Sequence, residues 1–173
     1  SRRVFAKRLF ALSDLCSRKH VFLGFHRNTR ARILFGSDPM SNLATPEAGA
    51  SVVLATCSDD DRHPPGCAID GTPGTCWVTT GMFPQELVVR LGKQTPVSRV
   101  KTLTTKVKGL ALEYSEGPQP DGFKPVFEVT LPDKGGDLQT ETHQFTAKAS
   151  FIKLRVASGY DDFASVHSIE VFS

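Results

Sequence analysis

Short apolar runs that alternate with polar residues recur from about residue 50 to the C-terminus, and no long stretch of helical period lies between them. The runs cover residues 52–56, 86–91, 97–103, 110–114, 126–131, 151–156 and 166–172. Clusters of Gly, Pro and Asp separate several of them, for example at 117–122 and 132–137. Short strands punctuated by turn residues are typical of a sandwich or a barrel. The sequence therefore predicts a single all-β domain, and within that class a jelly-roll β-sandwich.

Charge divides the chain into a basic extension and an acidic body. Residues 1–39 hold nine Lys or Arg residues and two acidic residues. Residues 40–173 hold twelve Lys or Arg residues and sixteen acidic residues. The net charge of +3 therefore belongs to the extension, and it gives no reason to expect a nucleic-acid partner for the body. We predict an extension over 1–39 that is not part of the fold, a linker over 40–50 and the sandwich over 51–173.

The extension allows three interpretations. Residues 1–12 are Arg-rich, free of acids and roughly amphipathic, as organelle transit peptides are, and a basic amphipathic helix on a membrane surface has the same features. Met40 lies where the composition changes, which favours the third interpretation, an upstream segment that the working protein lacks. No apolar run approaches the roughly 20 residues that span a bilayer, so no transmembrane segment is predicted.

The segment 68–77 carries the densest turn chemistry of the chain. Asp70 precedes Gly71, and Thr72-Pro73-Gly74 follows. Such a bend places a carboxylate beside inward-pointing carbonyls, and Ca²⁺ takes several oxygen ligands of these kinds. Asp-Gly and Pro-Gly pairs are also ordinary turn residues, so a plain turn remains the alternative. Trp77, the only tryptophan, is predicted to pin this loop to the core.

Several strings in the body are more specific than a strand pattern. They are Leu54-Ala55-Thr56, His63-Pro64-Pro65, Ile69-Asp70-Gly71, Trp77, Thr79-Thr80-Gly81-Met82-Phe83-Pro84-Gln85-Glu86 and Phe163-Ala164-Ser165-Val166-His167-Ser168. With them, the chain resembles the family of intraflagellar transport protein 25, also called heat-shock protein beta-11. That family belongs to the galactose-binding-like, discoidin-type sandwiches. The resemblance runs from about residue 51 to the C-terminus, and residues 93–150 match in pattern only.

The resemblance implies a non-enzymatic protein that pairs with a Rab-like small GTPase, intraflagellar transport protein 27. It also implies other subunits of the intraflagellar transport B complex as partners, and a location in the cilium or flagellum and the cytoplasm.

The resemblance further implies one calcium ion as cofactor. The ligands would be the Cys67 carbonyl, the Asp70 carboxylate, the Thr75 hydroxyl or carbonyl, and Ser168. Ser168 stands where the wider discoidin-type group has a glutamate, with Glu170 two residues further on. Calcium affinity falls as carboxylate ligands are removed, so we expect a structural or weak site.

Two functional hypotheses stay open. In the first, an adaptor buries Met82, Phe83 and Phe163 against the GTPase, because large apolar anchors carry most interface energy. The alternative for these three residues is that they plug the ends of the sandwich. The second hypothesis is a carbohydrate- or lipid-binding module, which needs exposed aromatic residues on its rim. With Trp77 assigned to the core, Tyr114 and Tyr160 remain for that purpose. His167 is predicted to be a packed or edge histidine and not a catalyst.

Overall fold

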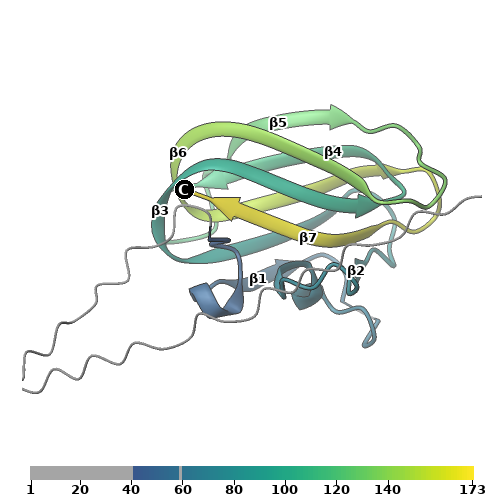
Figure 1. The fold of residues 1–173 in the computed structure, drawn as a ribbon, viewed down its shortest axis with the longest axis horizontal. Coiled ribbons are helices and arrows are strands. Elements are labelled where there is room, and N and C mark those ends of the chain that lie inside the picture. Colours follow the sequence, from purple (N-terminus) through teal and green to yellow (C-terminus); the bar gives the residue numbers. More distant parts are fainter. Residues whose placement is uncertain (1–40, 59) are drawn as a thin grey trace, which may run out of the picture. The chain divides into compact units, whose positions relative to one another are not determined.

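Two 21-residue strands, β3 (Gln85–Thr105) and β6 (Gln139–Gly159), run antiparallel and form the frame of the fold (Figure 1). The computed structural model describes residues 41–58 and 60–173. The predicted extension over 1–39 lies outside these residues. The remaining elements are η1 (Pro46–Ala48), β1 (Ser51–Ala55), η2 (Pro65–Ile69), β2 (Trp77–Val78), β4 (Val107–Ser115), β5 (Lys124–Thr130) and β7 (Ser165–Phe172), where η denotes a 3₁₀ helix.

The two long strands take part in both layers of a sandwich, because each pairs with different neighbours in its two halves. The first half of β3 pairs with β1 and with the second half of β6, and β4 and β5 continue this layer. The second half of β3 pairs with the first half of β6 and with β7, which in turn pairs with β2. All pairings are antiparallel. The predicted all-β sandwich is therefore confirmed.

The core lies between the two layers and follows the period of two that strands impose. In β6, Ile152, Leu154 and Val156 are fully buried, whereas Lys153 and Arg155 between them are only partly covered. Trp77 is also fully buried, and its Nε1 donates to the Cys57 carbonyl at 3.0 Å. The largest fully buried side chains are Trp77, Leu87, Leu110, Leu112, Leu131, Ile152, Leu154 and Ile169. The prediction that the tryptophan pins its loop to the core is confirmed.

The segment before β1 packs against the sandwich. Leu43 N–H donates to the Val171 carbonyl at 2.8 Å, and Asn42 Oδ1 accepts the Val171 N–H at 2.9 Å. Gly92 allows η1 to approach β3, because a Cβ at this position would lie 2.2 Å from the Ala48 carbonyl oxygen. The segment 40–50, which the sequence predicted as a linker, is therefore part of the packed body from Asn42 onward. Among the described residues, no helix is long and apolar enough to cross a membrane.

Candidate functional site

The predicted calcium loop begins where η2 ends. Asp70 follows η2 directly, and its Oδ1 accepts the Thr72 N–H at 2.8 Å, which is the local turn that Asp favours. Its Oδ2 accepts the Thr75 hydroxyl at 2.6 Å, and the Thr72 carbonyl lies 2.8 Å from the same hydroxyl. Oxygens of Asp70, Thr72 and Thr75 therefore gather within one tight turn.

Cys67 lies beside this oxygen cluster. Burial and the nearby Asp70 carboxylate both raise the pKa of the Cys67 thiol. Because its unperturbed pKa of 9.0 is already alkaline, the thiol stays protonated at neutral pH. The Cys67 side chain therefore supplies no thiolate ligand at neutral pH. The backbone role that the resemblance implies stays a prediction.

Ser168, the fourth predicted ligand, is placed differently. It is a buried residue of β7 that pairs with Leu103 of β3, and no hydrogen bond joins it to the Asp70 loop in the described part of the chain. The neighbouring Glu170 is also directed elsewhere, because both of its carboxylate oxygens lie 3.2 Å from Lys101 Nζ. The structure thus brings Cys67, Asp70 and Thr75 together and leaves Ser168 in the sheet.

His167 connects the loop to β7. Its Nδ1 lies 3.2 Å from the Pro73 carbonyl oxygen, and a carbonyl can only accept, so Nδ1 carries the proton. Nε2 then accepts from the hydroxyls of Ser165 and Thr105 at 3.2 and 3.1 Å. His167 is therefore a positioning residue for the loop. The sequence predicted a packed or edge histidine, and no short-range pattern indicated this contact, which spans 94 residues.

The donor set of this loop suits Ca²⁺ in kind. It consists of one carboxylate, one hydroxyl and backbone carbonyls, all hard oxygen ligands of the type that Ca²⁺ prefers. In residues 41–58 and 60–173 no three His, Cys, Asp or Glu side chains gather closely enough to hold a metal. A calcium ion here would therefore depend on Asp70 for charge, and on carbonyls and water for the rest of its coordination.

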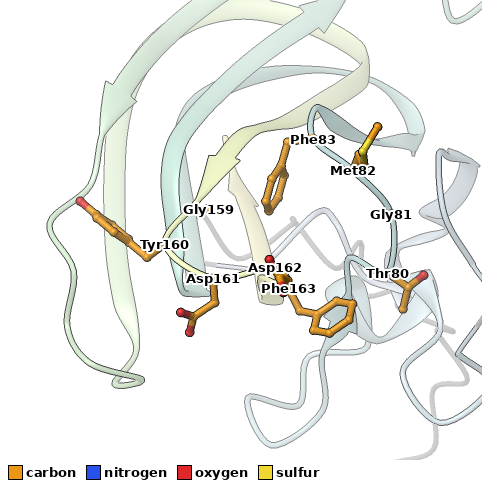
Figure 2. Close-up of a pocket in the computed structure, with 9 residues that line it drawn as sticks. All are labelled: Thr80, Gly81, Met82, Phe83, Gly159, Tyr160, Asp161, Asp162 and Phe163. Atoms are coloured by element: carbon orange, nitrogen blue, oxygen red, sulfur yellow. The ribbon is translucent and has the colours of Figure 1, made fainter.

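A second candidate site is a hollow of about 1050 Å³ between residues 80–83 and 159–163 (Figure 2). It is lined by Thr80, Gly81, Met82, Phe83, Gly159, Tyr160, Asp161, Asp162 and Phe163. Met82 and Phe163 are 90% and 57% exposed. The three predicted partner-binding residues, Met82, Phe83 and Phe163, thus line one hollow although they come from two distant segments.

Phe83 differs from the other two in being partly buried. It packs against the hydrophobic core, and its ring faces Gly159, where a Cβ would lie 2.6 Å from Cζ. The absence of a side chain at Gly159 is therefore what admits the ring. Phe83 forms a wall of the hollow and also closes this end of the sandwich, so the plugging alternative describes part of its role.

Hydrogen bonds fix the backbone around the hollow. Thr79 and Ala164 bond across its base, with Thr79 N–H donating to the Ala164 carbonyl at 2.9 Å. Gln85 Nε2 donates to the Met82 carbonyl at 2.6 Å, and the Gln85 side chain also accepts the Thr56 hydroxyl. Tyr160 N–H donates to the Lys106 carbonyl at 2.9 Å. Both walls are therefore anchored to the sandwich.

The charged residues that line the hollow are acidic. Asp161 pairs with Lys106 at 3.2 Å, and Lys106 also lies 3.6 Å from Asp133. The hydrogen bond that Lys106 donates to Asp161, and then the charges of the two carboxylates, raise the pKa of Lys106. Asp162 makes no ion pair with any residue that the structure describes. The hollow therefore combines apolar walls with one uncompensated carboxylate.

Comparison with known proteins places this fold and these loops in a family. Residues 53–169 match the F5/8 type C domain family. Intraflagellar transport protein 25 of Chlamydomonas reinhardtii is 45% identical over 132 residues, which cover 76% of this chain and 69% of that protein. The intraflagellar transport protein 25 homologue of Homo sapiens is 37% identical over 131 residues, covering 74% and 89%. The chain belongs to the intraflagellar transport protein 25 family.

Solved structures with a similar fold include carbohydrate-binding modules. A CBM32 module of Clostridium perfringens, solved with GalNAc-β-1,3-galactose, has a TM-score of 0.66 at 24% identity and covers 77% of this chain and 100% of its own. The family 32 module of C. perfringens NanJ, solved with galactose, has a TM-score of 0.62 at 25% identity and covers 74% and 96%. At this identity the likeness concerns the fold. It agrees with the galactose-binding-like sandwich predicted from the sequence.

Neither Trp77 nor Tyr160 presents its ring to the hollow. Trp77 is fully buried. Tyr160 points away from Phe83 and Phe163 in Figure 2, and its hydroxyl donates to the Leu131 carbonyl at 2.6 Å. The exposed apolar residues at the hollow are therefore Met82 and Phe163, and Met and aromatic residues are enriched at protein interfaces.

Proposed function

We propose that this chain is a non-enzymatic subunit of the intraflagellar transport B complex that forms a heterodimer with a Rab-like small GTPase, intraflagellar transport protein 27. The proposal places the protein in the cilium or flagellum and in the cytoplasm. Its family membership supports the transport role. The observation that carries the partner role is the exposure of Met82 and Phe163 on a rigid hollow.

The proposed interface uses the hollow because exposed apolar side chains beside anchored backbone make efficient contacts. A preorganised wall loses little conformational freedom on binding, and the anchors at Thr79, Gln85 and Tyr160 supply that rigidity. Met82 and Phe163 would be the central contacts. Phe83 would support them from below and is less suitable for a test, because its truncation also disturbs the core.

Affinity purification of the whole chain, residues 1–173, from ciliated cells tests this proposal. We expect a Rab-like small GTPase to co-elute in stoichiometric amount through size exclusion, as identified by mass spectrometry. The double substitution Met82→Gln and Phe163→Gln should weaken the pairing about tenfold or more, as hot-spot truncations do. Leu54→Gln is the matched control, because Leu54 is an exposed apolar residue of β1 that does not line the hollow.

Elution of the chain alone, or with glycoproteins in place of a GTPase, would overturn the adaptor role. The second outcome would favour the carbohydrate-binding alternative. A GTPase that binds the double variant as well as the wild type would leave the adaptor role standing and remove the hollow from the interface.

We further propose that the Asp70 loop binds one calcium ion and that the ion stabilises the loop. The oxygen cluster of Asp70, Thr72 and Thr75 supports this. Asp70 supplies the negative charge and His167 holds the loop on β7. A ligand that binds only the folded state stabilises it by about 2.7 kcal/mol at a hundred times its dissociation constant.

Thermal melts in calcium and in EGTA test the metal proposal. We expect a higher melting temperature with calcium in the wild type and no calcium effect in Asp70→Asn. Asp137→Asn, which removes an exposed carboxylate from another turn, should keep the calcium effect. Identical melts of the wild type in calcium and in EGTA would argue that the turn is structural only.

A further inference from the structure

The hollow is lined by acidic as well as apolar side chains, so an apolar contact alone would leave its carboxylates without a contact from the partner. Its only charged lining residues are Asp161 and Asp162. Asp162 lines the hollow together with Phe83 and Phe163, whereas the Asp161 carboxylate points away from both rings in Figure 2. A carboxylate and an exposed aromatic ring that line the same hollow suit a cation that is flat and partly apolar.

The two aspartates also differ in their neighbouring charges. Lys106 lies 3.2 Å from Asp161 and is shared with Asp133. Lys108 lies 6.0 Å from the centroid of the Tyr160 ring, and that ring points away from Phe83 and Phe163. Asp162 has no ion-pair partner among the residues described here. The uncompensated negative charge of the hollow is thus at Asp162.

We propose that the hollow receives an arginine side chain of the protein partner, with its guanidinium paired to Asp162 and stacked against Phe163. This inference rests on the proposed function, because it specifies how the partner occupies the same hollow. Arginine fits better than lysine, since the planar guanidinium binds a carboxylate through two parallel hydrogen bonds and stacks on aromatic faces. A lysine ammonium is compact and strongly hydrated, so it gains less from the aromatic walls.

The exposed apolar rim gives the ion pair its strength. A fully solvated ion pair contributes about 0–1 kcal/mol, which would not select a partner. Met82 and Phe163 stand at the rim, and a partner that covers them removes water from Asp162 as well. The pair then lies inside an interface, where removal of one charge is far more disruptive than at an open surface.

The first test uses small probes, so that it does not depend on the identity of the partner. The ¹⁵N-labelled full chain is titrated with N-acetyl-arginine methylamide, and amide shifts are followed by NMR. We expect shifts at Gly81, Gly159, Asp162 and Phe163 that saturate in the millimolar range, as suits a small ligand. The citrulline analogue, which keeps the length and loses the charge, should give no such shifts.

Two variants separate the aspartates. Asp162→Asn should abolish the arginine response, whereas Asp161→Asn removes the same formal charge and should preserve it. The lysine analogue should bind more weakly than the arginine probe. The inference would be overturned if the arginine probe caused no amide shifts in the wild type, or if the arginine and citrulline probes caused equal shifts.

The second test applies the same variants to the co-purified GTPase. Asp162→Asn should weaken the heterodimer about tenfold or more, mainly through faster dissociation, because a desolvated charge pair is lost. Asp161→Asn should change the affinity by less than about threefold, as suits an exposed pair. If the arginine probe binds and no GTPase is recovered, the proposed partner falls and the chemistry of the hollow stands. If the GTPase binds Asp162→Asn as well as wild type, the inference falls and the proposed function stands.

Discussion

Thr79 and Ala164 bond to each other in both directions across 85 residues of sequence. The Thr79 hydroxyl donates to the Ala164 carbonyl at 3.1 Å and accepts the Ala164 N–H at 3.0 Å, while Thr79 N–H donates to the same carbonyl at 2.9 Å. Both residues are buried. Because Thr79 leads into one wall of the hollow and Ala164 follows the other, this contact fixes the distance between the two walls.

Thr79→Val is expected to destabilise the protein by about 1–3 kcal/mol, since it leaves the buried Ala164 N–H without an acceptor at nearly unchanged side-chain shape. Urea denaturation measures the effect. Thr80→Val is the matched control, because the Thr80 hydroxyl is buried and has no partner among the described residues. Its replacement should be neutral or slightly stabilising. Equal losses in both variants would contradict the role given to Thr79.

Gly159→Ala is expected to displace the Phe83 ring. A Cβ at residue 159 would lie 2.6 Å from Phe83 Cζ, and overpacking of this kind costs about 1–3 kcal/mol of folding free energy. Chemical denaturation of the variant measures this loss of folding free energy. Adding Phe83→Leu to the same chain should recover part of the loss. Gly66→Ala, where a Cβ meets no atom within 4 Å, should change little; a similar loss there would point to backbone effects instead.

Gln139→Met should lower the free energy of unfolding by about 3 kcal/mol, because it leaves buried backbone groups without the hydrogen bonds that the Gln139 amide makes. Gln139 Oε1 accepts the Val107 N–H at 3.0 Å, and Nε2 donates to the carbonyls of Val107 and Pro132 at 2.7 and 2.8 Å. Equilibrium unfolding is again the measurement. Gln144→Met changes an exposed residue of the same strand and should be nearly neutral. A stable Gln139→Met protein would mean that water replaces the amide.

The Glu116–Lys124 pair is expected to make stability depend on pH in acid. A hydrogen bond from Lys124, at 2.7 Å, together with its charge lowers the pKa of Glu116 below the ordinary value of 4.5. The folded state therefore binds fewer protons than the unfolded state, so this contribution is complete above about pH 4.5 and is lost as the pH falls through the folded pKa. Lys124→Gln should bring the Glu116 pKa, measured by carboxyl NMR, back toward its ordinary value, and Lys93→Gln should not. No change in Lys124→Gln would refute the pairing.

Sequence alone predicted those parts of the fold in which aliphatic residues alternate. The second half of β6, with Ile152, Leu154 and Val156, was predicted for that reason. Its first half, from Gln139 to Ala149, was missed because Thr, Glu, His and Gln fill most of its positions. The prediction also treated 86–91 and 97–103 as separate strands. They form one strand because β3 bends through residues 91–94 between its two paired halves.

The candidate site was predictable only where neighbouring residues make it. Asp70 and Thr75 meet within one turn, so turn chemistry was enough to suggest them. The contact of His167 with Pro73 depends on how β7 packs beside the loop, and no short-range pattern encodes it. The same holds for the difference between Asp161 and Asp162, because it arises from Lys106 on another segment. Ser168 was proposed from the resemblance, and the structure places it in the sheet.

The continuity of β3 and β6 through both layers bears on how this family can change its chain length. A single residue inserted within either strand would turn the following side chains to the opposite face, and it would do so in two layers at once. At the bend, Arg90 pairs with Phe151 and Thr95 pairs with Ala149. Residues 91–94 lie between the two pairs on β3, whereas Ser150 alone lies between them on β6. That corner already absorbs an unequal number of residues. Length variation among relatives should therefore concentrate in the loops and at the two irregular positions of this pairing, this corner and the step between Val97 and Arg99, while the regularly paired stretches keep a constant number of residues.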